Sequence, residues 1–274
     1  MRVLAVNDIS CVGKCSLSVS LPLISACGVT CDVLPTAILS THTGGFENYT
    51  FRDLTEDIPA VLAHWKTLGI QFDFIYSGYL GSEKQIDLVL ALKKEFLAQN
   101  GVLVVDPVMG DNGELYAGFT PAFVEKMRKL CKQADYILPN ETEAAYLAAL
   151  PYPLPHAEEA LEKLKTLCPR PIITGVEKEE ELVVHYADGR GVCRRYPAKR
   201  VSGFFPGSGD IFASVFVGAL ARGKSQEQAV ALATDFTTAA IRRSKTEVED
   251  KRYGLNFEKE IFTLLKKLND CEEV

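Results

Sequence analysis

The sequence has no apolar run long enough to cross a membrane, and its first apolar stretch, residues 3–6, ends at once in Asn7 and Asp8. A membrane helix needs about 20 consecutive apolar residues, and a signal peptide needs a longer apolar core than this one. We therefore expect no membrane partner. The opening residues are interpreted as the first buried strand of a cytoplasmic protein.

Metal-binding and disulfide-type spacings are also missing. The eight cysteines form no Cys-x-x-Cys pair, and the four histidines form no His-x-x-x-His pair. Such spacings mark structural zinc sites and redox motifs. We expect reduced cysteines that serve as small buried core residues.

Positive charge is not in excess. Lys and Arg number 30 against 36 Asp and Glu, which gives a net charge of −6. A protein that grips nucleic acid regardless of sequence needs clustered cations to neutralise phosphates. We therefore expect no nucleic-acid partner, while a local basic pocket for one anionic ligand stays open.

What the chain does contain is a regular alternation of strand and helix patterns. Short apolar runs alternate with segments whose apolar residues recur every three or four positions. The predicted strands are 3–7, 33–39, 73–77, 101–106, 136–138, 172–174, 182–186 and 192–196, and the predicted helices are 14–27, 53–68, 83–99, 121–133, 141–149, 156–167, 209–222, 226–243 and 257–269. This order predicts a single α/β domain over 1–274, with a mostly parallel sheet. Ligands bind such sheets at the carboxyl ends of the strands.

The sharpest chemical signal is Gly207-Ser208-Gly209-Asp210 at the start of an apolar helix. The two glycines let backbone N–H groups converge on one point, and the positive end of the helix favours an anion there. Asp210 beside such an anion hole suits a general base acting where a phosphoryl group arrives. The structural alternative is an Asp that only begins a helix, although Ser208 could already cap it.

Two further segments place carboxylates at the predicted ligand-facing edge. Residues 106–113 (DPVMGDNG) and residues 139–143 (PNETE) each follow a predicted strand. Their oxygens are hard ligands suited to magnesium. A simple turn and a capping box formed by Asn140 and Glu143 are the structural alternatives.

Gly13-Lys14-Cys15 looks like the end of a phosphate-binding P-loop, but the motif is incomplete. Asp8 stands where the P-loop has its first glycine, and Cys15 replaces the hydroxyl residue that holds the metal. The P-loop interpretation is therefore rejected.

These segments, in this order, resemble the ribokinase superfamily. Residues 207–210 are similar to its G-T/S-G-D signature, and residues 140–143 to its N-x-x-E motif. Within the superfamily the chain resembles the pyridoxal kinases, which phosphorylate vitamin B6, through 40–44 (STHTG), 77–81 (SGYLG) and 106–111 (DPVMGD). The likeness runs from Val3 to about Ala240.

The resemblance implies a three-layer fold with a reduced lid, a homodimer, and phosphate transfer from ATP to the 5′-hydroxyl of pyridoxal, pyridoxine or pyridoxamine. It implies Mg²⁺ as cofactor and leaves a monovalent cation such as K⁺ open. Asp210 would be the base, with Gly207, Ser208 and Gly209 as the anion hole. The other implied residues are Asp106, Tyr116, Asn140, Glu143, Thr174 and Gly175 for ATP, Asp111 and Glu143 for the metal, and Asp8, Ala37, Leu39, His42, Thr43 and Tyr79 for the vitamer.

One position departs from the family pattern. Asp8 stands where many pyridoxal kinases have a serine that contacts the ring nitrogen. A carboxylate there would favour a protonated ring nitrogen, or reach a polar group of another pyridine or pyrimidine. The structural alternative is that Asp8 caps a turn at 10–13. Cys15 is a milder departure, at a position where a small aliphatic residue is usual.

Three other functions remain open. Hydroxymethylpyrimidine kinases of thiamine synthesis share the same superfamily signature. Sugar and nucleoside kinases usually carry a sheet lid after the first strand, for which residues 7–14 leave no room. A non-catalytic nucleotide or metabolite sensor on this fold would have lost the base, the glycines or the acidic residues, and this chain keeps them all.

Overall fold

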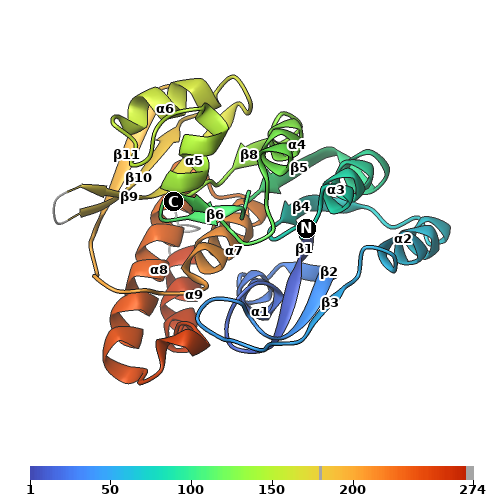
Figure 1. Ribbon diagram of the computed structural model, residues 1–274, viewed down its shortest axis with the longest axis horizontal. Coiled ribbons are helices and arrows are strands. Elements are labelled where there is room, and N and C mark those ends of the chain that lie inside the picture. The colour runs from blue at the N-terminus through green and yellow to red at the C-terminus, as the bar shows by residue number, and fades with distance from the viewer. Residues whose placement is uncertain (179–180, 270–274) are drawn as a thin grey trace.

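A computed structural model describes residues 1–178 and 181–269 and is built around one large sheet (Figure 1). The strands are β1 Arg2–Val12, β2 Thr30–Thr41, β3 Phe51–Asp53, β4 Phe72–Ser77, β5 Leu97–Val105, β8 Tyr136–Ile137, β9 Arg170–Lys178, β10 Glu181–Ala187 and β11 Cys193–Lys199. Their order across the sheet is β11-β10-β9-β8-β5-β4-β1-β2-β3. A separate hairpin joins β6 Gly110–Asp111 to β7 Glu114–Leu115.

The middle of the sheet is parallel and its edges are antiparallel. Every pair from β9 through β8, β5, β4 and β1 to β2 is parallel, whereas β3, β10 and β11 pair antiparallel. Interior parallel strands are covered on both faces and therefore read as continuous apolar runs. This explains why residues 3–6 are all apolar and buried.

Helices cover both faces of the sheet. One face carries α1 Leu17–Ala26, α7 Ser208–Ala221, α8 Gln226–Glu247 and α9 Ile261–Asn269, and the other carries α2 Ile58–Thr67, α3 Glu83–Phe96, α4 Pro121–Cys131, α5 Glu141–Ala148 and α6 Ala157–Leu164. Each set packs its own apolar cluster against the strands. The predicted three-layer α/β fold is confirmed.

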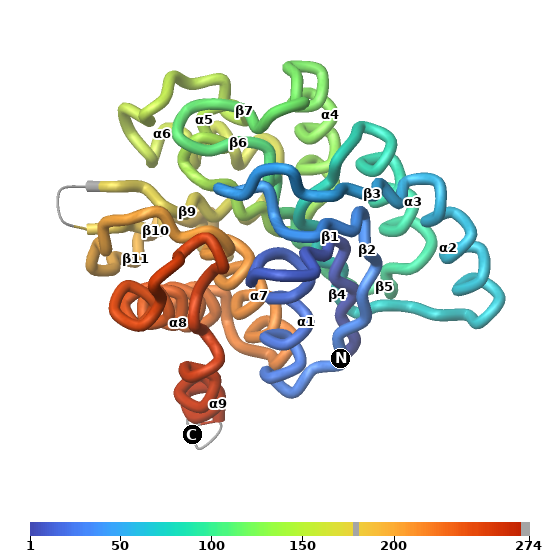
Figure 2. The backbone as a smooth tube through the Cα atoms, turned by 60° about the horizontal axis from the view of Figure 1, so that its bottom comes forward, coloured from blue at the N-terminus to red at the C-terminus, as the bar shows by residue number. Residues whose placement is uncertain are grey.

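Helix α7 is the central helix of its layer. It contacts α1 on one side and α8 on the other, and Figure 2 shows α1 and α7 side by side. Residues 211–219 of α7 are buried without a polar face, as expected for a helix enclosed by protein. A Cβ on Gly218 would stand 2.6 Å from Cys27 Sγ, so glycine permits the close approach of α1. The two helices thus pack closely along their length, and the start of α7 lies beside Ser16, the N-cap of α1.

Several predicted boundaries were wrong. The first strand runs on to Val12 rather than ending at Asn7, and the two predicted helices 14–27 and 257–269 begin only at Leu17 and Ile261. Strand β3 and the β6–β7 hairpin were not predicted. Segments of two or three residues are too short to show a period of two. Strand β3 is defined by its pairing with β2, and the hairpin by its two-residue turn Asn112-Gly113.

The cysteines are only partly core residues. All seven that lie within the described residues are free thiols, and Cys15, Cys27, Cys131 and Cys168 are buried as expected. Cys11 is exposed, so the expectation is wrong there, and Cys271 lies outside the described residues. Across 1–178 and 181–269, no helix combines the length and apolar character that a membrane crossing requires.

Candidate active site

The candidate site lies at β1, where successive strands switch from one side of the sheet to the other. Strand β2 pairs with one edge of β1, and the next long strand, β4, pairs with its other edge. Open α/β sheets bind ligands at such a point, at the carboxyl ends of the strands. Gly78 follows β4, Asp106 follows β5, and Asn140 lies beyond β8 at this same edge.

Asp8 lies within β1, so the expectation that it directly follows the first strand is wrong. Asn7 is opposite Pro35 of β2, and Ile9 is opposite Ile38. One residue of β1 therefore faces two of β2, which is a β-bulge. Bulges re-aim side chains and are frequent beside active sites. Because residues 9–12 continue the strand, the interpretation of Asp8 as the cap of a turn at 10–13 is also wrong.

Asp210 is held from two directions. The side-chain amide of Asn7 donates to its Oδ1 at 3.2 Å, and the backbone N–H of Ser16 donates to its Oδ2 at 2.8 Å. Loss of water raises the pKa of Asp210, while these two donors act in the opposite direction. The result is a fixed carboxylate with an increased affinity for a proton.

The two glycines beside Asp210 differ in what they do. Gly207 has φ 80°, and a Cβ there would lie 2.3 Å from the carbonyl oxygen of Lys14. Gly209 has no neighbouring atom within 4 Å of its Cβ position. Gly207 therefore permits the backbone turn, and Gly209 leaves open space at the N-terminus of α7. The first helical residue, Ser208, makes no capping bond, and Gly207 is the N-cap.

Asp8 is a second carboxylate close to Asp210. It is buried and accepts a hydrogen bond from the Ser16 hydroxyl at 2.6 Å. Burial raises its pKa to about 6, and the charge of Asp210 adds to the shift. A charged side chain in this position is costly without a partner.

The two residues expected to form apolar walls of the vitamer pocket lie in the strand next to β1. Ala37 and Leu39 are buried in β2. Tyr79 donates its backbone N–H to Asn7 Oδ1 at 2.8 Å, and its ring lies 5.9 Å from the ring of Phe119. Burial raises the pKa of Tyr79 to about 12, with the charge of Asp8 as the next cause. Tyr79 and Asp8 therefore share one electrostatic environment.

His42 joins two segments of the chain. Its Nδ1 accepts from the backbone N–H of Gly44 at 3.1 Å, and its Nε2 donates to the carbonyl oxygen of Arg252. Burial lowers the pKa of His42, so the neutral ring is favoured. Thr43 beside it is exposed. Both nitrogens of His42 are thus engaged within the protein, and its ring packs against Phe46 with a centroid distance of 5.1 Å.

The capping box at α5 is confirmed. Glu143 accepts from the backbone N–H groups of Met109 and Asn140, each at 2.9 Å. Asn140 Oδ1 accepts from the Glu143 N–H at 2.9 Å, while its Nδ2 donates to the Gly110 carbonyl at 2.8 Å. Burial raises the pKa of Glu143 to about 7. These four bonds fix the segment after β5 onto the start of α5.

The remaining acidic residues lie in the same field. Asp106 is buried, and its pKa is raised by burial first and then by Glu143 and Asp210. Partial burial, and then Glu143 and Asp111, raise the pKa of Tyr116, although 42% of this residue is exposed. The structure therefore brings together the predicted carboxylates at one edge of the sheet.

Thr174 and Gly175 lie beside Asn140. The backbone N–H of Thr174 donates to the Pro139 carbonyl at 2.9 Å, and Asn140 pairs with Thr174 as an isolated bridge. Gly175 has φ 74°, in the left-handed region that favours glycine. The segment that follows β8 is therefore joined to the middle of β9, where the resemblance expects nucleotide phosphates.

A magnesium ion would take only part of its coordination shell from these residues. Within the described ranges, no group of three or more His, Cys, Asp or Glu side chains is arranged to hold a metal. Asp111 is exposed, whereas both oxygens of Glu143 already accept backbone bonds. Mg²⁺ commonly takes one or two carboxylates and fills its shell with water and phosphate oxygens, and this site is compatible with that arrangement.

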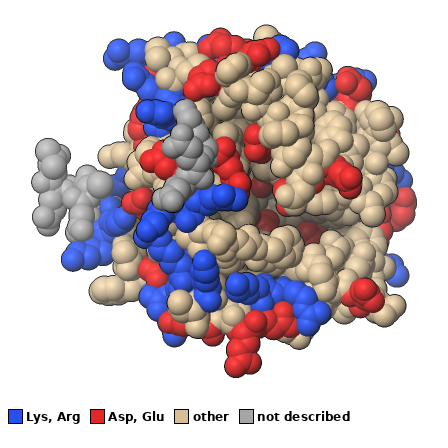
Figure 3. Space-filling model, turned by 60° about the vertical axis from the view of Figure 1, so that its left-hand side comes forward, with Lys and Arg blue, Asp and Glu red and all other residues tan. Residues whose placement is uncertain are grey.

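One face of the protein carries a group of basic side chains that could attract an anionic ligand. Figure 3 shows one face on which Lys and Arg side chains gather beside a hollow with acidic side chains inside it. A net charge of −6 therefore does not prevent a locally basic surface.

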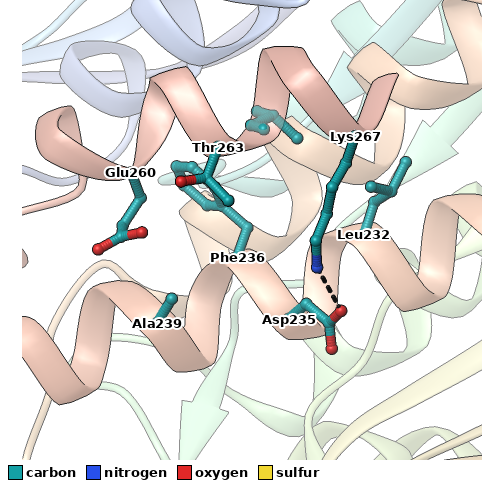
Figure 4. Close-up of a pocket in the computed structure, with 8 residues that line it drawn as sticks. Leu232, Asp235, Phe236, Ala239, Glu260, Thr263 and Lys267 are labelled. Carbon is teal, nitrogen blue, oxygen red and sulfur yellow. Dashed lines mark hydrogen bonds and ion pairs between the residues drawn. The ribbon is translucent and has the colours of Figure 1, made fainter. Parts of the chain in front are cut away.

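The small cavity of about 50 Å³ in Figure 4 is separate from the candidate site. Its lining residues belong to α8 and α9, together with Glu260, and include none of the site residues.

Two residues that hold the site were missed from the sequence. Asn7 and Ser16 both bond to Asp210, and neither belongs to a recognisable motif. The available signal was a polar Asn at the end of the apolar run 3–6. A buried polar side chain needs partners, and for Asn7 those partners lie at the candidate site.

Comparison with known proteins identifies the family. A family model described as phosphomethylpyrimidine kinase matches residues 21–256. The pyridoxal kinase of Lactobacillus plantarum superposes with a TM-score of 0.91 at 34% identity, covering 100% of this chain and 99% of that one. A Bacteroides thetaiotaomicron protein, provisionally described as a phosphomethylpyrimidine kinase and crystallised with pyridoxal, gives a TM-score of 0.91 at 37% identity and covers 96% and 95%.

Curated sequences are more distant. A provisionally described pyridoxal kinase of Schizosaccharomyces pombe is 28% identical over 200 residues, which is 68% of this chain but only 58% of that protein. The chain thus spans little more than half the length of this relative. The family model and the two superposed structures nevertheless cover most of this chain. The chain therefore belongs to the phosphomethylpyrimidine kinase family and, within the ribokinase-like superfamily, to its pyridoxal kinases.

Proposed function

We propose that this protein transfers the γ-phosphoryl group of ATP to the 5′-hydroxyl of a vitamin B6 vitamer, with Asp210 as the general base. The observation that carries the proposal is the pairing of a fixed, proton-attracting carboxylate with open space at the N-terminus of α7. The pyridoxal bound by the Bacteroides relative supports the substrate class.

In the proposed step, the hydroxyl proton passes to Asp210 as the substrate oxygen forms its bond to the γ-phosphorus. The bond between that phosphorus and the β,γ-bridging oxygen breaks, and its electron pair leaves with ADP. The raised pKa of Asp210 makes it a better proton acceptor than an ordinary Asp. Backbone N–H groups of 207–209 would stabilise the transferring group, whose charge is spread over its oxygens.

The nucleotide would lie along Asp106, Tyr116, Asn140, Glu143, Thr174 and Gly175. Mg²⁺ would be held by Asp111 and Glu143, largely through water, and would neutralise charge on the phosphates. The bond from Met109 to Glu143 keeps the segment after β5 next to α5, so both acidic residues stay at one edge. We assign no residues to a monovalent cation such as K⁺.

The vitamer would lie between β2 and Tyr79. Ala37 and Leu39 supply buried apolar surface, and Tyr79 is half-buried beside Asp8. Asp8 would accept a hydrogen bond from a protonated ring nitrogen. His42 and Thr43 would border this pocket. We also propose a cytoplasmic homodimer on the strength of the resemblance, and light scattering of the purified chain tests the dimer.

A second candidate is phosphorylation of hydroxymethylpyrimidine. The observation that favours it is Asp8, because a buried carboxylate could equally accept from an amino or protonated nitrogen of a pyrimidine. ATP turnover should be measured side by side with pyridoxal, pyridoxine, pyridoxamine and hydroxymethylpyrimidine. A kcat/KM for hydroxymethylpyrimidine at least tenfold above every vitamer would reject the first proposal in favour of the second.

A further inference from the structure

Every polar atom of the Asn7 side chain is used. Asn7 is fully buried, and its Nδ2 donates to Asp210 Oδ1 at 3.2 Å. Its Oδ1 accepts from the backbone N–H groups of Asp8 at 3.0 Å and Tyr79 at 2.8 Å. A primary amide supplies a donor and an acceptor from one planar group. Asn7 therefore joins β1, the end of β4 and the start of α7 through a single side chain.

Gly78 leaves the space that Asn7 occupies. A Cβ on Gly78 would stand 2.2 Å from Asn7 Nδ2 and 2.6 Å from Asn7 Cγ. Gly78 is not among the positive-φ residues, so its backbone does not demand glycine. The three nearest atoms to that Cβ position all belong to Asn7. The need for glycine at 78 thus comes from the Asn7 side chain.

We infer that Asn7 is a positioning residue for Asp210 and that Gly78 holds Asn7 in place; this inference rests on the proposed role of Asp210 as base. Asp210 Oδ2 is bound by a backbone N–H, which no side-chain change removes. The Asn7 amide is the second anchor, so it fixes the rotation of the carboxylate about its last side-chain bond. A displacement of about 1 Å at a reacting group can cost on the order of 10²-fold in rate.

The first test is Asn7→Asp, which keeps the size of the side chain. Its Oδ1 can still accept from Asp8 and Tyr79, but an oxygen replaces the donor that faces Asp210. We expect kcat for the vitamer to fall by about 10- to 100-fold, while KM for ATP stays within about twofold. The bonds from Asp8 and Tyr79 are retained, whereas the new carboxyl oxygen takes the place of the donor 3.2 Å from Asp210 Oδ1 and disfavours its charged form. A folded Asn7→Asp variant with kcat within twofold of wild type would therefore overturn the inference.

The second test is a double-mutant cycle between residues 7 and 78. Gly78→Ala should lower kcat in the wild-type background, because the new methyl group displaces the Asn7 amide. In the Asn7→Ala background the same methyl meets none of the atoms that it would strike in wild type. Its additional effect should then shrink to about twofold or less. An equal loss of kcat in both backgrounds would show that Gly78 does not act through Asn7.

The base itself is tested separately with Asp210→Asn. If that variant kept wild-type turnover, the proposed role of Asp210 would fail, whatever residue 7 does. If Asp210→Asn is impaired and Asn7→Asp is fully active, only the positioning role fails. Combining Asn7→Asp with Asp210→Asn completes the test. We expect no further loss of kcat beyond about twofold in the double variant, and a full additional 10- to 100-fold loss would place the action of Asn7 elsewhere.

Discussion

Asp8 and Asp210 are bound to the same residue, because Ser16 donates its hydroxyl to Asp8 at 2.6 Å and its backbone N–H to Asp210 at 2.8 Å. Ser16 has φ 56°, an uncommon value for a residue with a side chain. Such a backbone persists when surrounding contacts determine it. In the proposed function, Asp8 faces the ring of the vitamer and Asp210 faces its hydroxyl group. Ser16 therefore fixes the distance between the carboxylate that recognises the substrate and the carboxylate that removes the proton.

Asp210→Asn should lower kcat by about 10²–10⁴, the usual contribution of a general base. The Kd for ATP should change little, because the proposed nucleotide contacts come from other segments. Steady-state kinetics and calorimetric titration of ATP measure the two quantities. Turnover at the wild-type rate would remove Asp210 from the mechanism.

Two alanine substitutions distinguish backbone strain from ligand space at the start of α7. Gly207→Ala should destabilise the fold by more than about 1 kcal/mol, because its φ is 80° and its methyl would meet the Lys14 carbonyl. Gly209→Ala should keep or slightly raise the melting temperature, since its Cβ meets nothing within 4 Å. Its kcat/KM should nevertheless fall at least about tenfold, because the methyl group occupies the space for the transferring phosphate.

Comparing Gly207→Ala with Gly209→Ala separates an effect on stability from an effect on activity. Thermal unfolding of both variants gives the stability change, and initial rates with ATP and pyridoxal give the activity. If Gly209→Ala retained full kcat/KM, the open space at Gly209 would not be where the phosphoryl group passes.

The sequence predicted the parts of the site whose chemistry is local. Gly207 to Asp210 are consecutive residues, so one four-residue motif predicts the helix start, the anion hole and the base. Asn7 and Ser16 could not be found in this way, because they meet Asp210 across 203 and 194 positions. His42 is a similar case: its Nε2 is engaged by the Arg252 carbonyl 210 positions away.

The fold was predictable for a related reason. Buried parallel strands such as residues 3–6 produce apolar runs wherever they occur, and enclosed helices such as α7 are apolar all round. Short elements lack enough residues to show a period. Strand β3 depends on its pairing with β2 and has no sequence signal of its own. The β6–β7 hairpin did have a local signal that we missed, because Asn112-Gly113 forms its two-residue turn and both residues have positive φ.

Glu143→Gln should raise the Mg²⁺ concentration needed for half-maximal rate by several-fold, because it removes one of two charged oxygen ligands from the proposed metal site. It should also lower stability by about 1–3 kcal/mol, since the new NH₂ group would face a backbone N–H of Met109 or Asn140. Rates over a Mg²⁺ series and urea unfolding measure these effects. Reduced stability with an unchanged Mg²⁺ dependence would leave Glu143 as a capping residue alone.

The stability of an Asp8→Asn variant should depend on pH in a defined way. Burial raises the pKa of Asp8 from 3.8 to about 6, so folding favours its protonated form. That contribution is present below pH 4 and is lost as pH rises through about 6. Asn retains an oxygen for the Ser16 hydroxyl and carries no charge. Relative to wild type, Asp8→Asn should therefore gain stability between pH 4 and 6, by at most about 3 kcal/mol, and stay level above. Urea unfolding that gives a pH-independent difference would contradict this assignment.

Asp8 should also decide how tightly the vitamer binds. In the proposed complex its carboxylate pairs with a protonated ring nitrogen, a charge-assisted bond worth roughly 1.5–3 kcal/mol. Asp8→Ser should therefore raise the vitamer Kd by about 10- to 100-fold, while the Kd for ATP and the melting temperature at pH 8 do not fall. Asp8→Asn is the matched control, because it loses the charge but keeps an acceptor for Ser16. An analogue with carbon in place of the ring nitrogen cannot form the bond, so wild type and Asp8→Ser should bind it almost equally. An equal loss of affinity for the vitamer and for the carbon analogue would instead mean that Asp8 shapes the pocket without pairing with the ring nitrogen.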